Sequence, residues 1–210
     1  MRPSMRVPAR ALRGFGACLL AALLCASAPI AAEEQPSDEQ LMDDLMWSRG
    51  PIGGPFTLAD HTGRLRSDTE FRGKLMLIYF GYSFCPDICP TDLMTIAQAL
   101  DALGEAGAAV QPIFITIDPE RDTTERLAEY VSSFHPRLIG LTGTPDDIRK
   151  IALAYKAYYA KKENGRGEDY TIDHTGVTYL VGRDGRYLGF VPPQTNAERL
   201  VEVIRGQLTK

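Results

Sequence analysis

The stretch that decides the fold runs from Lys74 to Leu93 and reads KLMLIYFGYSFCPDICPTDL. Its first half holds six apolar residues, Leu75 to Phe80, without the alternation of a strand that has one wet face. Such a run is typical of a strand covered on both sides, as in the parallel sheet of an α/β fold. Gly81 ends the strand. A helix is predicted next, because apolar residues recur at spacings of three and four to about Glu105.

Cys85 and Cys89 lie where this strand turns into the helix. The first helical turn has unpaired N–H groups and the positive end of the macrodipole, which favour a thiolate over a thiol. Residues four apart on one helical face have Cβ atoms about 5 to 6 Å apart, whereas a disulfide needs about 3.5 to 4.5 Å. The reduced, metal-binding pair is therefore the relaxed state if both are helical, and both states are accessible if Cys85 precedes the helix. The alternative is that the two cysteines form a structural disulfide or are simply buried as apolar residues. Pro86 and Pro90 argue against this alternative, because they indicate an exposed turn.

The first 32 residues have the pattern of an export leader. Residues 1–13 contain four arginines and no acid, and an uncharged apolar stretch follows to Ala32. This stretch reaches roughly the lower limit of a membrane span, so both cleavage and retention as an anchor remain open. The arginines place the N-terminus on the cytoplasmic side. We expect a signal peptide or membrane anchor in residues 1–32, a linker in 33–50 and a domain in 51–210 at the periplasmic face, anchored to the inner membrane or soluble after cleavage.

The chain beyond the leader is acidic and has the length of a single domain. The leader contains four of the 23 basic residues and none of the 27 acidic ones, which leaves a net charge of −8. This charge argues against nucleic-acid binding. Cys18 and Cys25 lie in the leader, so the exported part keeps one thiol pair. In an oxidising compartment such a pair either forms a disulfide or is kept reduced for a purpose.

Strands and helices alternate along the rest of the chain. Residues 161–169 are polar and contain the turn dipeptide Asn164-Gly165, which predicts a surface hairpin or loop. The order of elements is that of a thioredoxin-like α/β fold, with a central mixed sheet flanked by helices, an N-terminal β-hairpin and an inserted surface loop. We expect further strands at 112–118, 138–141, 177–181 and 187–191. Further helices are expected to begin near residue 123, at Thr144 and at Thr195. The helix from Thr144 has an apolar stripe that runs from Ile148 to Tyr159.

Two thiolates and one imidazole form a ligand set suited to copper, because thiolate selects Cu(I) and imidazole suits either oxidation state. In a thioredoxin-like fold the loop before the third main strand lies opposite the thiol turn, and His174 occupies that loop. We therefore predict that Cys85, Cys89 and His174 bind copper, as Cu(I), Cu(II) or both.

Two carboxylates are candidates for supporting this site. Asp173 either orients the imidazole of His174 or only solvates the loop. Asp118 ends a strand at the edge where α/β sheets place their ligands, or it is a turn or cap residue. Four other side chains that could bind a metal are assigned to structure: His61 as solvent-exposed, His135 as structural, and Met42 and Met46 as apolar packing against the domain edge.

The chain resembles the Sco/SenC family of copper-handling proteins. The resemblance covers nearly all of residues 51–207 and is specific, because CxxxCP after an aromatic-rich strand occurs together with a downstream Asp-His pair. It rests on Gly54-Pro55-Phe56, Tyr79 to Leu93, Ile117 to Asp122, Phe134 to Arg137, Leu141 to Pro145, and Asp173-His174.

This resemblance implies a thioredoxin-fold domain that is anchored in the membrane, faces the periplasm and binds copper through Cys85, Cys89 and His174. Family members help to deliver copper to the binuclear copper site of cytochrome c oxidase, or keep the cysteines of that site reduced. We expect a copper metallochaperone rather than an enzyme. Its expected partners are the copper-site subunit of cytochrome c oxidase, other periplasmic copper chaperones and thiol reductants.

The main alternative is a thiol-disulfide oxidoreductase, in which one cysteine attacks and the other resolves. His174 discriminates between the two functions, because tight copper binding needs it and disulfide exchange does not. A thiol peroxidase is a third hypothesis, although nothing in the sequence singles out a peroxide pocket.

Overall fold

The computed structural model describes residues 51–166 and 169–209. Within them a seven-stranded mixed sheet has the order β2-β1-β5-β4-β3-β8-β9, and β6 and β7 form a separate two-stranded sheet. The strands are β1 Thr57–Asp60, β2 Leu65–Ser67, β3 Leu75–Gly81, β4 Val110–Thr116, β5 Ile139–Thr142, β6 Tyr159–Arg166, β7 Asp169–His174, β8 Thr178–Val181 and β9 Tyr187–Val191. The helices are α2 Ile88–Leu103, α3 Thr124–Ser132, α4 Pro145–Tyr155 and α5 Ala197–Leu208, with short 3-10 helices η1 Asp68–Phe71 and η2 Gly104–Ala109.

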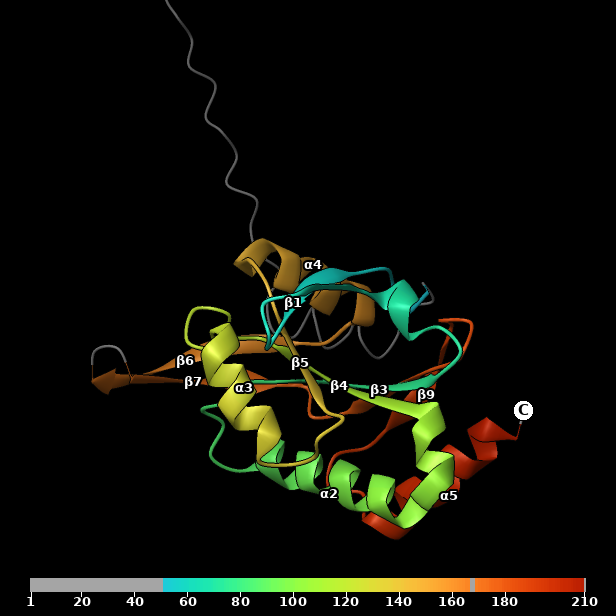
Figure 1. The fold of residues 1–210 in the computed structure, drawn as a ribbon. Coiled ribbons are helices and arrows are strands. Elements are labelled where there is room, and N and C mark those ends of the chain that lie inside the picture. Colours follow the sequence, from blue (N-terminus) through green and yellow to red (C-terminus); the bar gives the residue numbers. More distant parts are fainter. Residues whose placement is uncertain (1–50, 167–168, 210) are drawn as a thin grey trace, which may run out of the picture. The chain divides into compact units, whose positions relative to one another are not determined.

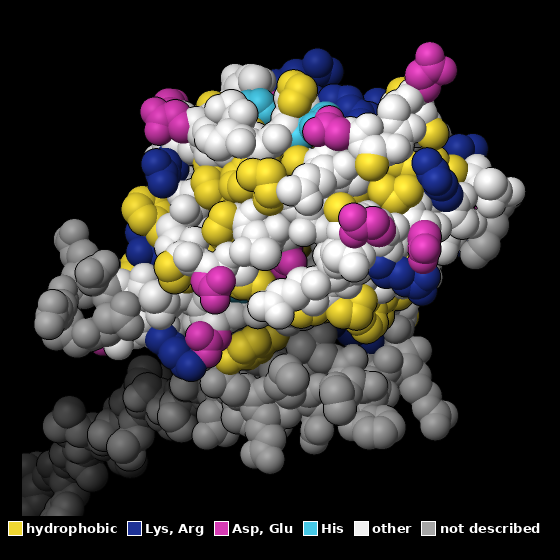
Figure 2. Space-filling model, turned by 90° about the horizontal axis from the view of Figure 1, so that it is seen from below, with side chains coloured by type: hydrophobic (Ala, Val, Ile, Leu, Met, Phe, Trp, Pro, Cys, Tyr) yellow, Lys and Arg dark blue, Asp and Glu magenta, His cyan; other side chains and the backbone are white. Residues whose placement is uncertain are grey.

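Helices cover both faces of the sheet. Helices α2 and α5 lie side by side on one face and α4 lies on the other (Figure 1). The predicted α/β class, with a central mixed sheet flanked by helices, is therefore confirmed. Figure 2 shows the molecule from below the view of Figure 1. Apolar, acidic and basic side chains are interspersed on the molecular surface seen in this view.

Strand β3 is the centre of the core. All seven of its residues are buried, because β4 pairs with it in parallel on one side and β8 antiparallel on the other, while helices cover its faces. The predicted strand covered on both sides is thus confirmed. The residues that follow Gly81 therefore lie at the carboxyl end of this central strand.

Helix α2 begins inside the CxxxC motif. Asp87 occupies its N-cap position without a side-chain hydrogen bond, and Cys89 is its second residue. Cys85 lies in the preceding turn, where its backbone N–H donates to the carbonyl of Tyr82 over 3.1 Å. The two cysteines therefore differ in setting: Cys89 belongs to the first helical turn and Cys85 to the loop before it.

The predicted end of one helix and the predicted position of one turn were wrong, although the surface hairpin at residues 161–169 is confirmed. Helix α4 ends at Tyr155, because Lys156 adopts a left-handed conformation with a φ of 54°, and Tyr159 instead begins β6. The dipeptide Asn164-Gly165 lies within β6, where the pairing register shifts between Glu163 and Arg166, and not in the turn. The expected insertion is therefore a β-hairpin of β6 and β7 that leads directly to His174.

The N-terminal β-hairpin is confirmed as β1 and β2. Asp60 closes it by accepting hydrogen bonds from the backbone N–H groups of Thr62 and Arg64. The predicted leader and linker, together with Met42 and Met46, lie outside the described residues. Within the described part of the chain, no helix is both long and apolar enough to cross a membrane.

Gly81 leaves the space that the sulfur of Cys89 occupies. A Cβ atom at this position would lie 2.7 Å from Cys89 Sγ and 3.0 Å from ring atoms of both Phe114 and Tyr79. Real Cβ atoms essentially never come within 3.0 Å of such neighbours, so any larger residue must displace the thiol or the sheet.

We expect Gly81→Ala to lower the free energy of unfolding by about 1 to 3 kcal/mol, the usual cost of overpacking a core. Urea unfolding of the reduced protein measures this. Gly206→Ala is the matched control in α5: a Cβ there meets nothing within 4 Å, and stability should rise by about 0.5 to 1 kcal/mol. A Gly81→Ala protein as stable as the parent would show that this contact does not constrain the fold.

Candidate metal centre

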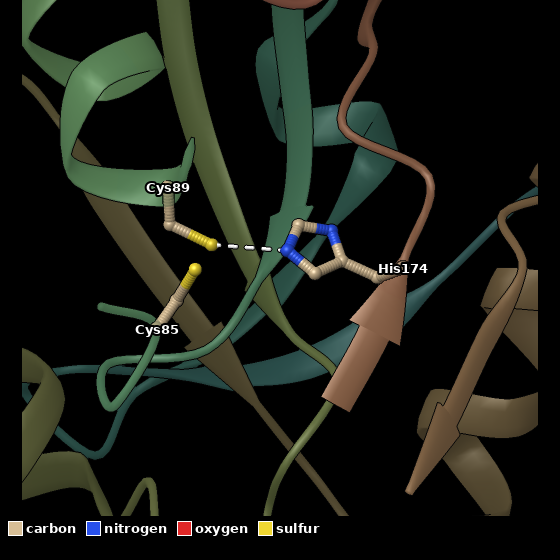
Figure 3. A group of neighbouring side chains, drawn as sticks. All are labelled: Cys85, Cys89 and His174. Atoms are coloured by element: carbon tan, nitrogen blue, oxygen red, sulfur yellow. Dashed lines mark hydrogen bonds between the residues drawn. The ribbon is translucent and has the colours of Figure 1, made fainter. Parts of the chain in front are cut away.

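The fold brings the three predicted ligands together. The sulfur atoms of Cys85 and Cys89 and a ring nitrogen of His174 all lie within 4.8 Å of one another, and Cys89 Sγ is 3.3 Å from His174 Nε2. Figure 3 shows the three side chains converging from the loop before α2, from α2 itself and from the end of β7. The predicted proximity of His174 to the thiols is therefore present, across 85 residues of sequence.

The two thiols differ in charge and in accessibility. A hydrogen bond with Cys89 lowers the pKa of Cys85 to about 3, and one with His174 acts in the same direction. Burial raises the pKa of Cys89, and the neighbouring Cys85 raises it further. Cys89 is fully buried, whereas Cys85 is partly exposed. At neutral pH the pair thus carries one proton on Cys89 and a thiolate on the accessible Cys85.

The backbone orients the imidazole of His174. Its Nδ1 lies 3.3 Å from the carbonyl oxygen of Thr175, which can only accept a hydrogen bond. The other ring nitrogen, Nε2, faces Cys89 Sγ at 3.3 Å. The rings of Tyr79 and Tyr82 meet the imidazole edge-on, with centroids 6.3 and 5.9 Å away, and so fix the plane of the ring.

This donor set fits copper. Two sulfur atoms and one imidazole nitrogen are soft and intermediate ligands. The metal would have three protein ligands and an open side, because an apolar cavity of about 880 Å³ is lined by Cys85 and His174 among others. A ligand from another molecule can therefore approach from the cavity.

Asp173 does not contact the imidazole of His174. Its exposed carboxylate forms an ion pair with Lys162 in the neighbouring strand β6, and the carbonyl of Thr175 lies at Nδ1 of the imidazole. Of the two roles considered for Asp173, this exposed setting favours a carboxylate that solvates the loop.

Asp118 supports the rim of the site without touching the three ligands. Its buried carboxylate accepts a hydrogen bond of 2.7 Å from the hydroxyl of Tyr170 and forms an ion pair with Arg121. The guanidinium of Arg121 lies 3.6 Å from the ring centroid of Tyr170 and 4.8 Å from that of Phe84. Arg121 also donates to the carbonyl of Tyr170. It thereby joins the loop that carries Cys85 to the strand that carries His174.

Two further buried carboxylates support the site, and the sequence analysis missed both. Asp122 accepts hydrogen bonds from the backbone N–H of Ser83 at 3.0 Å and from its hydroxyl at 2.5 Å. Asp92 lies one turn after Cys89 and accepts from the hydroxyl of Tyr79. The available signal for Asp92 was a charged residue inside the apolar face of a predicted helix, which is unusual unless it is paired.

The other two histidines lie in separate structural settings. His61 Nδ1 accepts from the backbone N–H of Gly140, which lies in β5, at 3.2 Å. His135 Nε2 is 3.5 Å from a carboxylate oxygen of Asp101, and its Nδ1 accepts from the N–H of Arg137. His61 is partly buried rather than solvent-exposed, because it packs against this strand.

Comparisons with known proteins agree with the fold and with the chemistry of the site. A family model described as SCO1/SenC matches residues 46–209. The human protein SCO1 homolog, mitochondrial, is 44% identical over 141 residues, which are 66% of this chain and 47% of that protein. The chain thus spans about half the length of this relative.

Solved structures give the same result. ScoI from Bradyrhizobium japonicum with copper bound is 42% identical, with a TM-score of 0.70 over 74% of this chain and 99% of that one. BsSco, a member of the Sco family of cytochrome c oxidase assembly proteins in which a disulfide switch was identified, is 24% identical, with a TM-score of 0.60 over 77% of this chain and 97% of that one. These likenesses confirm the thioredoxin-like fold.

The charge state of Cys85 can be measured by alkylation. A thiol of pKa about 3 is ionised above that pH, so the rate of Cys85 alkylation by iodoacetamide should change little between pH 8 and pH 5. An ordinary cysteine, with a pKa of about 8.5, slows about tenfold for each pH unit below its pKa. Site-resolved mass spectrometry measures both cysteines, and Cys89 should react far more slowly.

In Cys89→Ala the thiol donor to Cys85 is gone, so the pKa of Cys85 should rise and its alkylation should become pH-dependent. Ordinary pH dependence of Cys85 in the unmodified protein would contradict the assignment.

Arg121 should contribute more to stability than its neighbour Arg126. Arg121→Lys keeps a charge beside Asp118 but loses the planar contact with Tyr170 and Phe84, so we expect a loss of about 1 to 2 kcal/mol in urea unfolding. Arg126 also lies over Phe84, at 4.9 Å, but has no contact with the hairpin. Arg126→Lys should cost less than about 0.5 kcal/mol, and equal losses would argue against a role for the hairpin contacts.

Proposed function

Because the chain belongs to the SCO1/SenC family, we propose that it is a copper metallochaperone that delivers copper to the binuclear copper site of cytochrome c oxidase. The observation that carries the proposal is the convergence of Cys85, Cys89 and His174 within 4.8 Å, with Cys89 buried and the other two partly exposed. A copper-bound relative with the same fold supports it. The family's place among cytochrome c oxidase assembly proteins supports the choice of recipient.

The geometry favours transfer by ligand exchange. Within the described residues three protein atoms converge on the position of the metal, so a thiolate of the recipient can enter from the cavity before any ligand leaves. Cys85 would leave first, because it is the partly exposed thiolate and borders the cavity. Cys89 and His174 would hold the metal until the recipient has supplied enough ligands of its own. No step of this exchange needs a change in the oxidation state of copper.

A thiol-disulfide oxidoreductase is the second candidate, and the low pKa of Cys85 is the observation that favours it. In this reaction the Cys85 thiolate attacks a substrate disulfide and releases one substrate thiolate. Cys89 then displaces the second substrate thiol and forms the Cys85–Cys89 disulfide, which an external thiol reductant must reduce. Cys85 lies before the helix, so both the dithiol and the disulfide are accessible to the backbone.

We also propose that the domain acts at the periplasmic face, with residues 1–32 as its export leader or anchor and 33–50 as a linker. The arginine-rich start and the apolar stretch that follows support export. The recipient would be the copper-site subunit of cytochrome c oxidase. Other periplasmic copper chaperones and thiol reductants would load the site and keep its cysteines reduced.

A copper titration tests the proposal. The reduced protein should bind one Cu(I) per chain in competition with a chelator of known affinity. Loss of an outer-shell residue typically weakens a metal site by about 10- to 100-fold, so Cys85→Ser and His174→Ala, which each remove a ligand, should weaken binding by at least about 100-fold. His61→Ala, outside the site, is the control and should bind as the parent does.

Unchanged binding in His174→Ala would remove His174 from the ligand set. Absence of tight copper binding in the parent protein would favour the oxidoreductase. That second function predicts that His174→Ala keeps full disulfide-exchange activity while Cys85→Ser loses it.

A further inference from the structure

The cavity beside the candidate copper site extends well past the three ligands. Its volume of about 880 Å³ lies in the range of sites that enclose a whole small molecule, whereas an incoming thiolate needs only a narrow approach. Its walls are mainly apolar and aromatic, and they include Val177, Tyr179, Tyr187 and Phe190. The side chain of Phe190 remains exposed to water. An apolar hollow with a polar rim is the usual form of a binding surface.

The first described residues lie at the rim of this cavity. Ile52 forms part of its wall. The next residue is held in place, because the backbone N–H of Gly53 donates to the carbonyl of Ala154 over 2.8 Å. A Cβ atom at Gly53 would lie 3.6 Å from the ring of Tyr155, which also lines the cavity. The residues before 51 are therefore attached at a fixed point beside the apolar walls.

The sequence just before this point contains an apolar stripe. Residues 41–47 read LMDDLMW, and we call them the upstream segment. Its leucine and methionine residues form two pairs, each four residues apart, which is the spacing of one helical face. Trp47 is the only tryptophan of the chain. The match to the family model begins at residue 46, so the last two residues of the segment belong to the matched region.

We propose that the upstream segment docks in this cavity of its own chain, with its apolar side chains against the apolar walls, and covers the open side of the candidate copper site. This assigns a surface to the apolar packing predicted for Met42 and Met46. A recipient that enters from the cavity would displace the segment. The docking goes beyond the proposed function and does not depend on it, because the contacts join apolar side chains and involve no metal.

Length and attachment favour this occupant. Trp47 precedes Ile52 by five residues, and an extended chain spans about 17 Å over that length, which is farther than the distance across a cavity of about 880 Å³. An aromatic side chain removes about 150 to 250 Å² from water when it is buried, and methionine adapts to irregular aromatic walls. Attachment through so short a connection acts as a local concentration in the millimolar range, so a contact of sub-millimolar affinity keeps the segment mostly docked.

A second cavity is a poorer match for the segment. It has a volume of about 780 Å³ and also borders Ile52, but its wall includes the charged side chains of Asp68, Arg72 and Arg186. Asp68 and Arg72 form an ion pair there. An apolar stripe that entered this cavity would take charged groups out of water, which costs free energy.

The single tryptophan makes the docking measurable. In the reduced full chain we expect blue-shifted emission of Trp47 and slow quenching by acrylamide, because its indole lies among apolar side chains. Phe190→Glu places a charge in the cavity wall, so it should shift the emission to the red and accelerate the quenching several-fold. Leu188→Glu is the matched control and should behave as the parent does. Leu188 is exposed in the same strand, β9, but the cavity is lined by other residues.

Two further pairs of variants separate docking from misfolding and from the second cavity. Leu45→Glu lies outside the described domain, so it leaves the core unchanged and should release Trp47. Ser48→Glu adds a charge without removing an apolar side chain, and it should not release Trp47. Arg186→Glu alters the wall of the second cavity and not that of the first. Release of Trp47 by Arg186→Glu but not by Phe190→Glu would overturn the proposal in favour of the second cavity.

Three other results would also overturn the proposal. Emission of Trp47 that is typical of water in the parent protein means that the segment is not docked. Equal shielding of Trp47 in all variants means that something other than this cavity covers it. Emission that moves to the red on dilution means that the cavity belongs to a second copy of the chain.

Alkylation of Cys85 shows whether the docked segment covers the candidate copper site. At fixed pH, iodoacetamide should modify Cys85 several-fold faster in Leu45→Glu than in the parent, and Ser48→Glu should match the parent. Release of Trp47 without faster alkylation would overturn the covering of the site.

These measurements contain no copper, so they are independent of the titration that tests the proposed function. If the parent protein binds no copper while Trp47 is released by Phe190→Glu and Leu45→Glu alone, the proposed function fails and the docking stands. If the parent binds copper tightly while Trp47 is exposed in it, the docking fails and the proposed function stands.

Discussion

The contact between Cys89 and Gly81 is the constraint on which the site depends. A Cβ atom at Gly81 would lie 2.7 Å from the Cys89 sulfur, so the thiol is packed against the end of the central strand as part of the core. Strand β3 is fixed in turn by β4 and β8 on its two sides. One candidate ligand is therefore fixed by the packing of the central sheet. The other two candidate ligands only need to be brought to it, and both come from segments outside the seven-stranded sheet.

Separate polar contacts hold those two segments. Asp122 binds the backbone and hydroxyl of Ser83 and so fixes the loop before Cys85. Asp118, Arg121 and Tyr170 join this loop to strand β7, at whose end His174 lies. These contacts centre on the buried carboxylates of Asp118 and Asp122, whereas Cys85 and His174 themselves are partly exposed and Cys89 is enclosed. Of the three candidate ligands, one is packed in the core and two are held by side-chain contacts, which is the difference that the proposed ligand exchange would require.

The sequence predicted those features that depend on residues close together in the chain. The apolar run of β3 and the stripe of α2 are periodic patterns, and the ligand set followed from two thiols and one histidine placed in a recognised order of elements. The polar supports could not be found in this way, because their partners are distant: Asp92 meets the N–H of Gln194 over 102 residues, and Asp122 meets Ser83 over 39. Which of its two roles Asp173 takes also depends on a contact that the sequence does not show, because His174 turns its Nδ1 toward the backbone carbonyl of Thr175. The end of α4 depended on a positive φ at Lys156, which its residue type does not predict.

One arrangement of thiols can serve both candidate functions because the two sulfurs hold different charges before anything binds. Cys85 is a thiolate at the surface of the cavity, and Cys89 is a thiol inside the core. A metal ion and a substrate disulfide are both electrophiles, and both would first meet Cys85, which borders the cavity. In either proposed function the second step would use the sulfur of Cys89, as a metal ligand or as the nucleophile that resolves a mixed disulfide. The groups around Cys89 would therefore decide how readily the site proceeds from first contact to completion. His174 would add a third ligand only to a metal, and this contribution is the physical basis on which the two proposed functions differ.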